Sequence, residues 1–182
     1  NRNFNAKWRQ VDYGYGLVSS DPDAMTYRGP RPKSEPETRA VISFLNATQP
    51  RAVFSFHALA SITGANFLAA RAAETDRNYV RTCTDLAESF VRGFYRKNKR
   101  WRAGISFGAS AGSLPEYAYR KLGIPGFDLE WDGNPDAQPS HTDNTSRSML
   151  ETYQSRHYHG LVSMLQDCAK KKSRTTEPTR SQ

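Results

Sequence analysis

The spacing of apolar positions along the chain predicts helices that alternate with short strands. Helices are expected where apolar residues recur every three or four positions, and strands where β-branched and aromatic residues form short runs. The predicted helices cover residues 34–46, 75–97, 115–121 and 148–168, and the predicted strands cover residues 52–57, 103–107 and 124–131. Because helices alternate with strands, the predicted class is α/β with a mixed or largely parallel sheet.

Three of these helices carry apolar positions that are most simply surfaces facing a core. A helix that buries one face repeats its apolar residues along one stripe, and such a stripe needs no cofactor to explain it. The stripes are Val41, Phe44 and Leu45 in the first helix, where Ser34 is the expected cap, then Tyr79, Cys83, Leu86, Phe90 and Phe94, and finally Leu150, Tyr153, His157, Leu161 and Leu165.

The charge balance raises the possibility of a nucleic-acid partner. The 182 residues include 26 Lys and Arg against 18 Asp and Glu, a formal net charge of +8. Part of the excess lies in residues 92–102, where Tyr95 and Trp101 could stack on single-stranded nucleic acid. A solvated helix end, where cations are favourable, explains the same cluster more simply. Residues 170–182 form a second basic segment, which we expect to be a flexible tail after one domain over residues 1–169.

Cysteine count and hydropathy limit the remaining classes. Cys83 and Cys168 are too few for a disulfide scaffold, although one disulfide between them is possible. No apolar run approaches the roughly 20 residues that cross a bilayer, so a membrane partner is not expected. The chain begins at Asn1 without a methionine, which predicts a fragment or a processed piece.

Three polar features suggest a cleft at the ends of the strands. His57 ends one predicted strand, Glu130 lies in another, and Asn1 and Arg2 lie in a loop. Ligands of an open α/β sheet bind outside the carboxyl ends of its strands. Taken alone, His57 is more often a hydrogen-bonded core residue, and Glu130 could be half of a buried ion pair. The hypothesis of a site therefore depends on their occurring together.

Several runs of residues resemble zinc carboxypeptidases of the pancreatic A and B type. These runs are Asn1-Arg2-Asn3-Phe4 with Trp8, Tyr27-Arg28-Gly29-Pro30, Ser34-Glu35-Pro36-Glu37-Thr38, Phe54-Ser55-Phe56-His57, and Phe127-Asp128-Leu129-Glu130. The resemblance covers roughly residues 1–131. It implies a three-layer α/β sandwich with a mixed, mostly parallel central sheet that is incomplete at the N-terminus, and a secreted or extracellular protein.

The resemblance also implies a reaction, a cofactor and roles for particular residues. The reaction is hydrolysis of the C-terminal peptide bond, with Zn²⁺ as the cofactor and a peptide C-terminus as the substrate. Asn1 and Arg2 would bind the free carboxylate, which a guanidinium matches with two hydrogen bonds. His57 would be one zinc ligand, and Glu130 would be the general base.

Departures from the family pattern affect both activity and specificity. The two other zinc ligands of the family come from a His-x-x-Glu segment, and no histidine of this chain has a glutamate three residues later. The chain alone is therefore expected to be inactive unless an N-terminal half, from the same precursor or a separate chain, completes it. Phe107 stands where the pancreatic enzymes have a substrate-contacting tyrosine. Leu114 corresponds to the base of the specificity pocket and predicts release of an apolar residue.

A second hypothesis is a catalytically incomplete, peptidase-like module for binding or assembly. Such a module would keep the fold and the recognition of chain ends, but it would have no reason to keep both His57 and Glu130. An upstream His-x-x-Glu would favour the enzyme, and its absence would favour the module.

Overall fold

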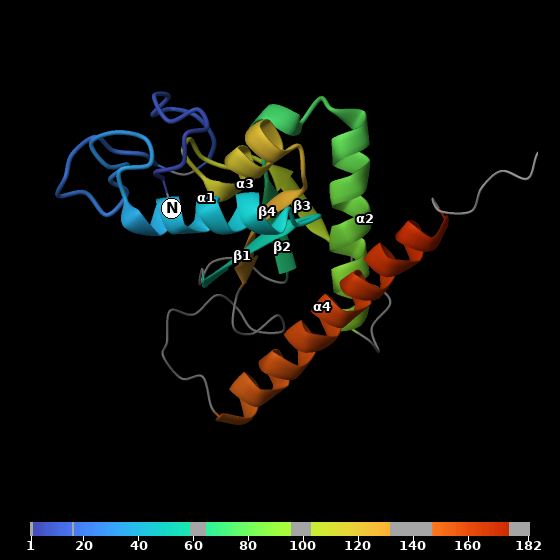
Figure 1. The fold of residues 1–182 in the computed structure, drawn as a ribbon. Coiled ribbons are helices and arrows are strands. Elements are labelled where there is room, and N and C mark those ends of the chain that lie inside the picture. Colours follow the sequence, from blue (N-terminus) through green and yellow to red (C-terminus); the bar gives the residue numbers. More distant parts are fainter. Residues whose placement is uncertain (1, 16, 59–64, 96–102, 132–146, 175–182) are drawn as a thin grey trace, which may run out of the picture.

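Four strands form an open mixed sheet with helices on both faces in the computed structural model (Figure 1). The structure describes all residues except 1, 16, 59–64, 96–102, 132–146 and 175–182. The strands are β1 (Val53–Ala58), β2 (Ala65–Ala69), β3 (Gly104–Phe107) and β4 (Gly126–Trp131). The helical elements are α1 (Pro36–Thr48), η1 (Arg71–Ala73), α2 (Arg77–Phe94), α3 (Leu114–Tyr117), η2 (Ala118–Leu122) and α4 (Arg147–Arg174).

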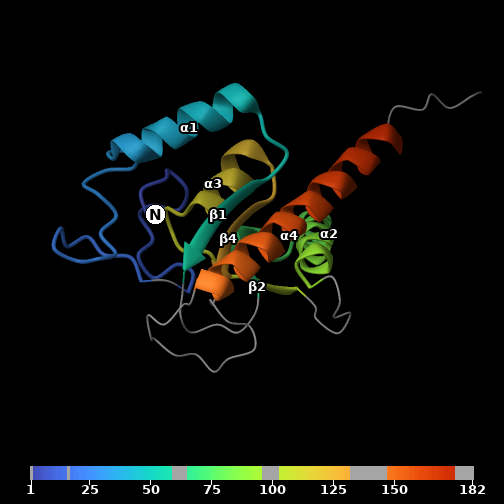
Figure 2. The same ribbon diagram turned by 90° about the horizontal axis from the view of Figure 1, so that it is seen from below.

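The sheet order is β1-β4-β2-β3, so strands distant in the sequence lie side by side. The pairs β1–β4 and β2–β3 are parallel, whereas β2–β4 is antiparallel. Helices α1 and α3 lie on one side of the strands, and α2 and α4 lie on the other (Figure 2). This arrangement confirms the predicted three-layer α/β class with a mixed, mostly parallel sheet.

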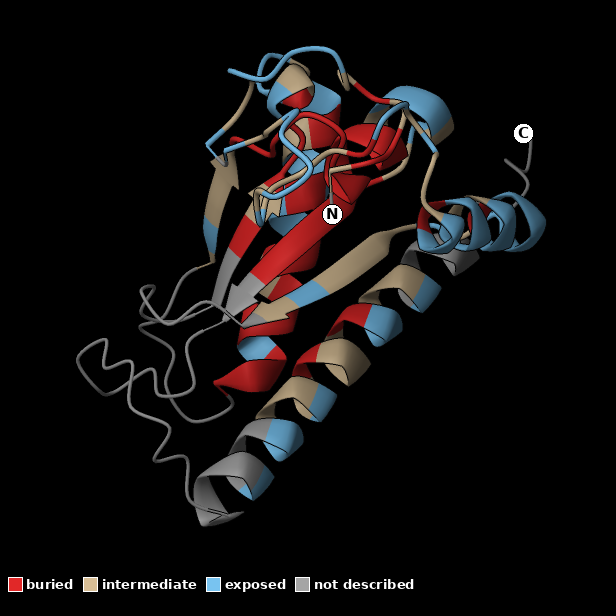
Figure 3. Cartoon of the chain, turned by 90° about the vertical axis from the view of Figure 1, so that its left-hand side faces the viewer, coloured by how far each residue is buried: buried red, intermediate tan, exposed pale blue. Residues whose placement is uncertain are grey.

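The main core lies between the sheet and α2. The side chain of Asp76 caps α2 by accepting hydrogen bonds from the amides of the helix's first turn. The predicted stripe of α2 is confirmed as buried, and its Phe90 meets Phe67 edge to face with ring centroids 5.6 Å apart. Phe67 contacts Phe127 of β4 at the same 5.6 Å. Figure 3 shows the buried residues gathered along the strands and α2.

The first and last helices bury only part of their predicted stripes. In α1, Leu45 is buried in the second core cluster as predicted, but Val41 and Phe44 are exposed, and Ile42 packs against that cluster instead. Its N-cap is Glu35 rather than Ser34, whose hydroxyl donates to the Glu35 carboxylate at 2.6 Å. The neighbouring N-terminal loop engages Ser34, which moves the helix start by one residue.

In α4 the buried line runs through Gly160 and Met164, whereas Leu165 is 62% exposed. His157 and Leu161 are half-buried, and the side chains of the two earlier positions of the predicted stripe lie outside the described residues. The helix continues to Arg174, so it includes the first five residues of the predicted tail.

The strands differ from prediction in two places. Strand β2 was absent from the prediction, although it lies between β4 and β3 in the sheet. Strand β1, predicted to be buried, is the first strand in the order, and its Phe56 is 53% exposed.

Both cysteines are free thiols, so the possible disulfide between Cys83 and Cys168 is absent. None of the helices in the described part of the chain has the length and apolar character needed to cross a bilayer.

Candidate active site

His57 lies near the carboxyl end of β1, within a small polar cluster. Its Nε2 atom is 3.0 Å from the hydroxyl of Ser55 and 3.3 Å from Oδ1 of Asp128. The His57 side chain is 32% exposed, whereas that of Asp128 is 6% exposed. Alternation along the strands explains the grouping, because Ser55 and His57 share one face of β1, and Asp128 is paired with Ser55 across the sheet. The cluster therefore presents a partly exposed imidazole over a buried carboxylate.

The backbone register brings His57 and Glu130 together. These two positions are direct partners in the parallel β1–β4 pair. Both strands run in the same direction, so both positions lie toward the carboxyl ends of neighbouring strands, where open α/β sheets bind their ligands. The side chain of Glu130 lies outside the described residues.

The N-terminal segment that carries Arg2 packs against the loop that precedes α3. Nε of Arg2 donates to the carbonyl of Leu17 at 3.1 Å. Its backbone packs against Gly112, where an added Cβ would lie 2.0 Å from the Arg2 oxygen. Gly112 also has a φ of +68°, a conformation that favours glycine. Two backbone hydrogen bonds, from Phe4 to Gly112 and from Gly112 to Ala6, fix the segment in place. Asn1, the predicted partner of Arg2, lies outside the described residues.

Asn3 connects the N-terminal segment to residues 28–35. This buried side chain donates to the carbonyls of Arg28 and Arg31 and to the hydroxyl of Ser34. Its oxygen accepts from the amide of Glu35 at 3.0 Å. One side chain thereby joins Arg2's segment to the start of α1, and the residues that carry the family resemblance in this region are in part structural.

The two predicted specificity residues lie in different layers. Leu114 is buried in the cluster between the N-terminal segment and α3, beside Phe4 and Tyr117. It is two residues after Gly112, so it belongs to the same part of the structure as Arg2. Phe107 is partly buried against the main core instead, in the β3 position paired with Ala69.

Sequence reasoning missed a buried carboxylate close to this loop. Glu116 is fully buried, and its Oε1 accepts from the hydroxyl of Tyr13 at 2.9 Å and from the amide of Ala72 at 3.0 Å. Its Oε2 accepts from Nε of Arg120 at 3.0 Å. Burial raises the pKa of Tyr13. The sequence shows only the i,i+4 spacing of Glu116 and Arg120, and the other two partners come from separate segments.

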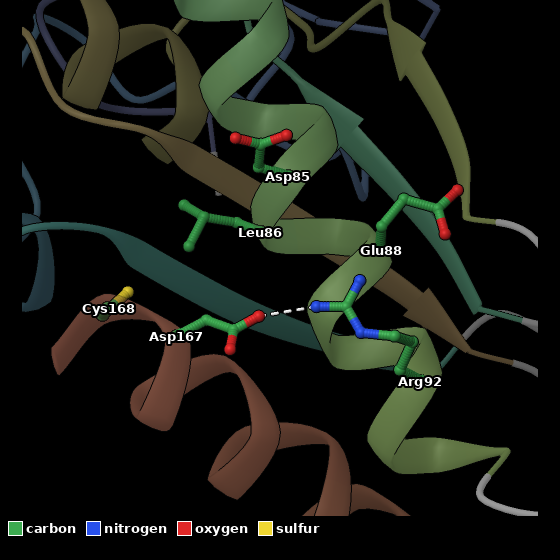
Figure 4. Close-up of a pocket in the computed structure, with 6 residues that line it drawn as sticks. All are labelled: Asp85, Leu86, Glu88, Arg92, Asp167 and Cys168. Atoms are coloured by element: carbon green, nitrogen blue, oxygen red, sulfur yellow. Dashed lines mark hydrogen bonds and ion pairs between the residues drawn. The ribbon is translucent and has the colours of Figure 1, made fainter. Parts of the chain in front are cut away.

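A pocket on the helical side contains none of the predicted site residues. It is lined by α2 and α4, and its Arg92 and Asp167 form an ion pair at 2.5 Å (Figure 4). Arg92 is the first residue of the predicted basic cluster, and residues 96–102 of that cluster lie outside the described residues. Arg92 therefore has a partner within the protein, and its presence in the basic cluster needs no nucleic-acid ligand to explain it.

The described residues of the polar cluster around His57 provide fewer ligands than a catalytic zinc needs. A catalytic zinc requires three protein ligands and one open position. Among the described residues no group of three or more His, Cys, Asp or Glu side chains could hold a metal ion. An imidazole whose second nitrogen faces a carboxylate does fit the role of a single zinc ligand. The described residues therefore supply one ligand position and do not form a complete site.

The sequence of the chain is similar to those of known proteins. Residues 1–154 match the family described as zinc carboxypeptidase. Carboxypeptidase A6 of Homo sapiens is 34% identical over 128 residues, which are 69% of this chain and 28% of that protein. The chain therefore spans less than a third of that relative.

Two solved structures have the same fold at low sequence identity. Bovine thrombin-activatable fibrinolysis inhibitor, solved in complex with tick carboxypeptidase inhibitor, superposes with a TM-score of 0.71 at 18% identity, covering 94% of this chain and 56% of its own. Carboxypeptidase A from Helicoverpa armigera superposes with a TM-score of 0.63 at 17% identity. The superposition covers 91% of this chain and 40% of that structure's chain.

Proposed function

Because the chain belongs to the zinc carboxypeptidase family, we propose that it supplies the C-terminal part of a peptidase that removes the last residue of a peptide. The observation that carries the proposal is the pairing of His57 with Glu130 on neighbouring parallel strands. Positions in register lie side by side in a sheet, so the backbone places the proposed metal ligand next to the proposed general base.

The remaining zinc ligands are assigned to a segment upstream of this chain, in the same precursor or as a separate chain. The chain covers only 28% of human carboxypeptidase A6, so the relative has ample sequence for such a segment. Among the described residues, no strand pairs with the outer edge of β1. An unpaired strand edge is a template for a further strand, and we place the upstream segment there.

The chain's own residues account for recognition and proton transfer. Arg2, together with Asn1, binds the terminal carboxylate of the substrate, and its guanidinium makes two parallel charge-assisted hydrogen bonds to the two carboxylate oxygens. When bound, zinc supplies Lewis-acid polarisation of the scissile carbonyl. Glu130 accepts the proton of the attacking water and delivers it to the departing amine. Leu114 favours an apolar C-terminal residue, and Phe107 provides no hydroxyl to the substrate.

The test is release of a C-terminal amino acid by the complete protein. Glu130→Gln removes the base while keeping the shape of the side chain, so kcat should fall by about 10²- to 10⁴-fold. The matched control is Glu37→Gln, at an exposed position in the first turn of α1, which should leave kcat unchanged. A chelator should abolish turnover.

Amidation of the substrate tests the role of Arg2 separately. An amide lacks the charge that the guanidinium binds, so an amidated peptide should be cleaved far more slowly than the free acid. Full activity of Glu130→Gln, or activity that survives metal removal, would refute the enzyme. Peptide binding that depends on the free carboxylate without any turnover would instead support the binding module.

A further inference from the structure

Asp128 is a buried carboxylate whose environment is unusual. The residue is 4% exposed, and its Oδ1 accepts no hydrogen bond of good geometry from the described residues. A buried carboxylate oxygen without a donor is costly, and such an atom calls for a specific partner. His57 Nε2 lies 3.3 Å from this oxygen. The contact is slightly longer than an ideal hydrogen bond but within the range of an ion pair.

The sheet itself fixes this contact. Ser55 and Asp128 are direct partners in the β1–β4 register, and His57 follows Ser55 by two positions on the same face. The carboxylate therefore reaches the imidazole diagonally across two adjacent strands. Strand backbones hold both groups, so the orientation does not depend on a loop.

Two side chains approach Nε2 of His57, and they differ in whether they can select an imidazole tautomer. Ser55 Oγ lies 3.0 Å from Nε2, but a hydroxyl both donates and accepts, so it is compatible with either tautomer. An ionised carboxylate only accepts. The Asp128 carboxylate can accept a hydrogen bond from the tautomer that carries hydrogen on Nε2. In the other tautomer Nε2 carries a lone pair, which the carboxylate repels.

We propose that Asp128 is the positioning residue that holds His57 in the tautomer with hydrogen on Nε2. Nδ1 then carries the lone pair, so it is the nitrogen that could ligate a metal, and the carboxylate increases the basicity of that ligand. The metal-binding consequence rests on the proposed function. The tautomer is a property of this chain and can be measured without metal or substrate.

The experiment is a two-bond ¹H–¹⁵N correlation spectrum of the full chain labelled on histidine, in metal-free buffer well above the ordinary histidine pKa of about 6.5. The signals of His57 are assigned with the variant His57→Gln. The wild-type chain should show His57 in the Nε2–H form alone. Asp128→Asn, which removes the charge and offers an amide donor, should give a mixture of both tautomers.

Two further variants separate this proposal from a structural role. Ser55→Ala should keep the Nε2–H form, and Asp12→Asn, at an exposed position, should reproduce the wild-type spectrum. The Nδ1–H form in the wild type overturns the proposal without any variant, so it stays testable even if Asp128→Asn does not fold. An unchanged tautomer in folded Asp128→Asn, or loss of the preference in Ser55→Ala, also overturns it. Failure of catalysis in the complete protein leaves this result intact.

Discussion

Glu116 joins three segments that are distant in the sequence, and its removal should be costly. It accepts hydrogen bonds from Tyr13 in the N-terminal loop, from Ala72 in η1 and from Arg120 in η2. Removing one partner of a buried ion pair typically costs 3–5 kcal/mol, and Arg120 is 33% exposed and can recover some hydration. Glu116→Ala should therefore lower the free energy of unfolding by about 3 kcal/mol in urea titrations. Glu74→Ala, at an exposed position, should change it by less than about 0.5 kcal/mol, and an equal effect of both would contradict the structural role.

Because the Cys83 thiol is buried, we expect the protein to lose stability in alkaline solution. Burial is the main cause that raises the pKa of this thiol from 9.0 to about 12, and burial also raises the pKa of Tyr79. A group whose pKa is higher in the folded state binds protons more tightly there. Its contribution is therefore fully present below pH 9 and declines as the pH rises toward 12. Urea midpoints should fall above pH 9, and the fall should be shallower in Cys83→Ala. Parallel curves for the two proteins would rule out the thiol as a source.

At the same scale, the sequence singled out two candidate residues that the fold places side by side. His57 and Glu130 each lie within a short motif, and the register of β1 and β4 pairs them, while their catalytic roles stay a prediction. Asp128 appeared within one of those motifs without a role, because its proximity to His57 depends on strand pairing. Glu116 was missed for a similar reason, since its partners are 44 residues or more apart from it in two cases.

Among the elements, helices were easier to predict than strands. The stripe of α2 follows the helical period closely and is buried as expected. Strand β2 escaped prediction because its sequence, Ala-Asn-Phe-Leu-Ala, has no β-branched residue and continues into an alanine-rich segment. Its central position in the sheet, where Phe67 is fully buried, decides its conformation. Tertiary packing therefore overrides local preference there.

The packing of α2 on α4 requires a glycine at position 93. A Cβ added at Gly93 would lie 2.1 Å from the carbonyl oxygen of His159, which is backbone and cannot rotate away. In an isolated helix, Gly→Ala stabilises by about 1 kcal/mol. Here the sign should reverse, and Gly93→Ala should destabilise by roughly 1–3 kcal/mol, the usual range for overpacking.

Thermal unfolding of Gly93→Ala against Arg81→Ala measures this effect. Arg81 is exposed on the same helix, so its substitution reports helix propensity without the steric conflict. A melting temperature of Gly93→Ala at or above that of the wild type would show that the two helices do not approach as closely as described.

Considered as a whole molecule, the chain has a core on each face of its sheet, whereas its described residues form no group of three metal ligands. One cluster lies between the sheet, α2 and α4, and the other joins the N-terminal segment to α1 and α3. The fold class was predictable because it follows from alternating helices and strands. The proposed catalytic roles were predictable only through the family resemblance, since a role in catalysis leaves no periodic pattern in a sequence.

The shortage of metal ligands among the described residues makes zinc binding the sharpest test at that scale. The described residues offer His57 with Asp128 beside it and no group of three ligands, whereas a protein that includes the upstream segment should have three. After dialysis against zinc and removal of the excess, the 182-residue chain should retain well under one equivalent of metal. The longer protein should retain one, and His57→Ala should remove it there. Because the same substitution in the short chain has almost no bound metal to release, the contrast assigns the ligand independently of turnover. Stoichiometric zinc in the short chain, lost in His57→Ala, would instead locate a complete site within these residues and reject the assignment of ligands to the upstream segment.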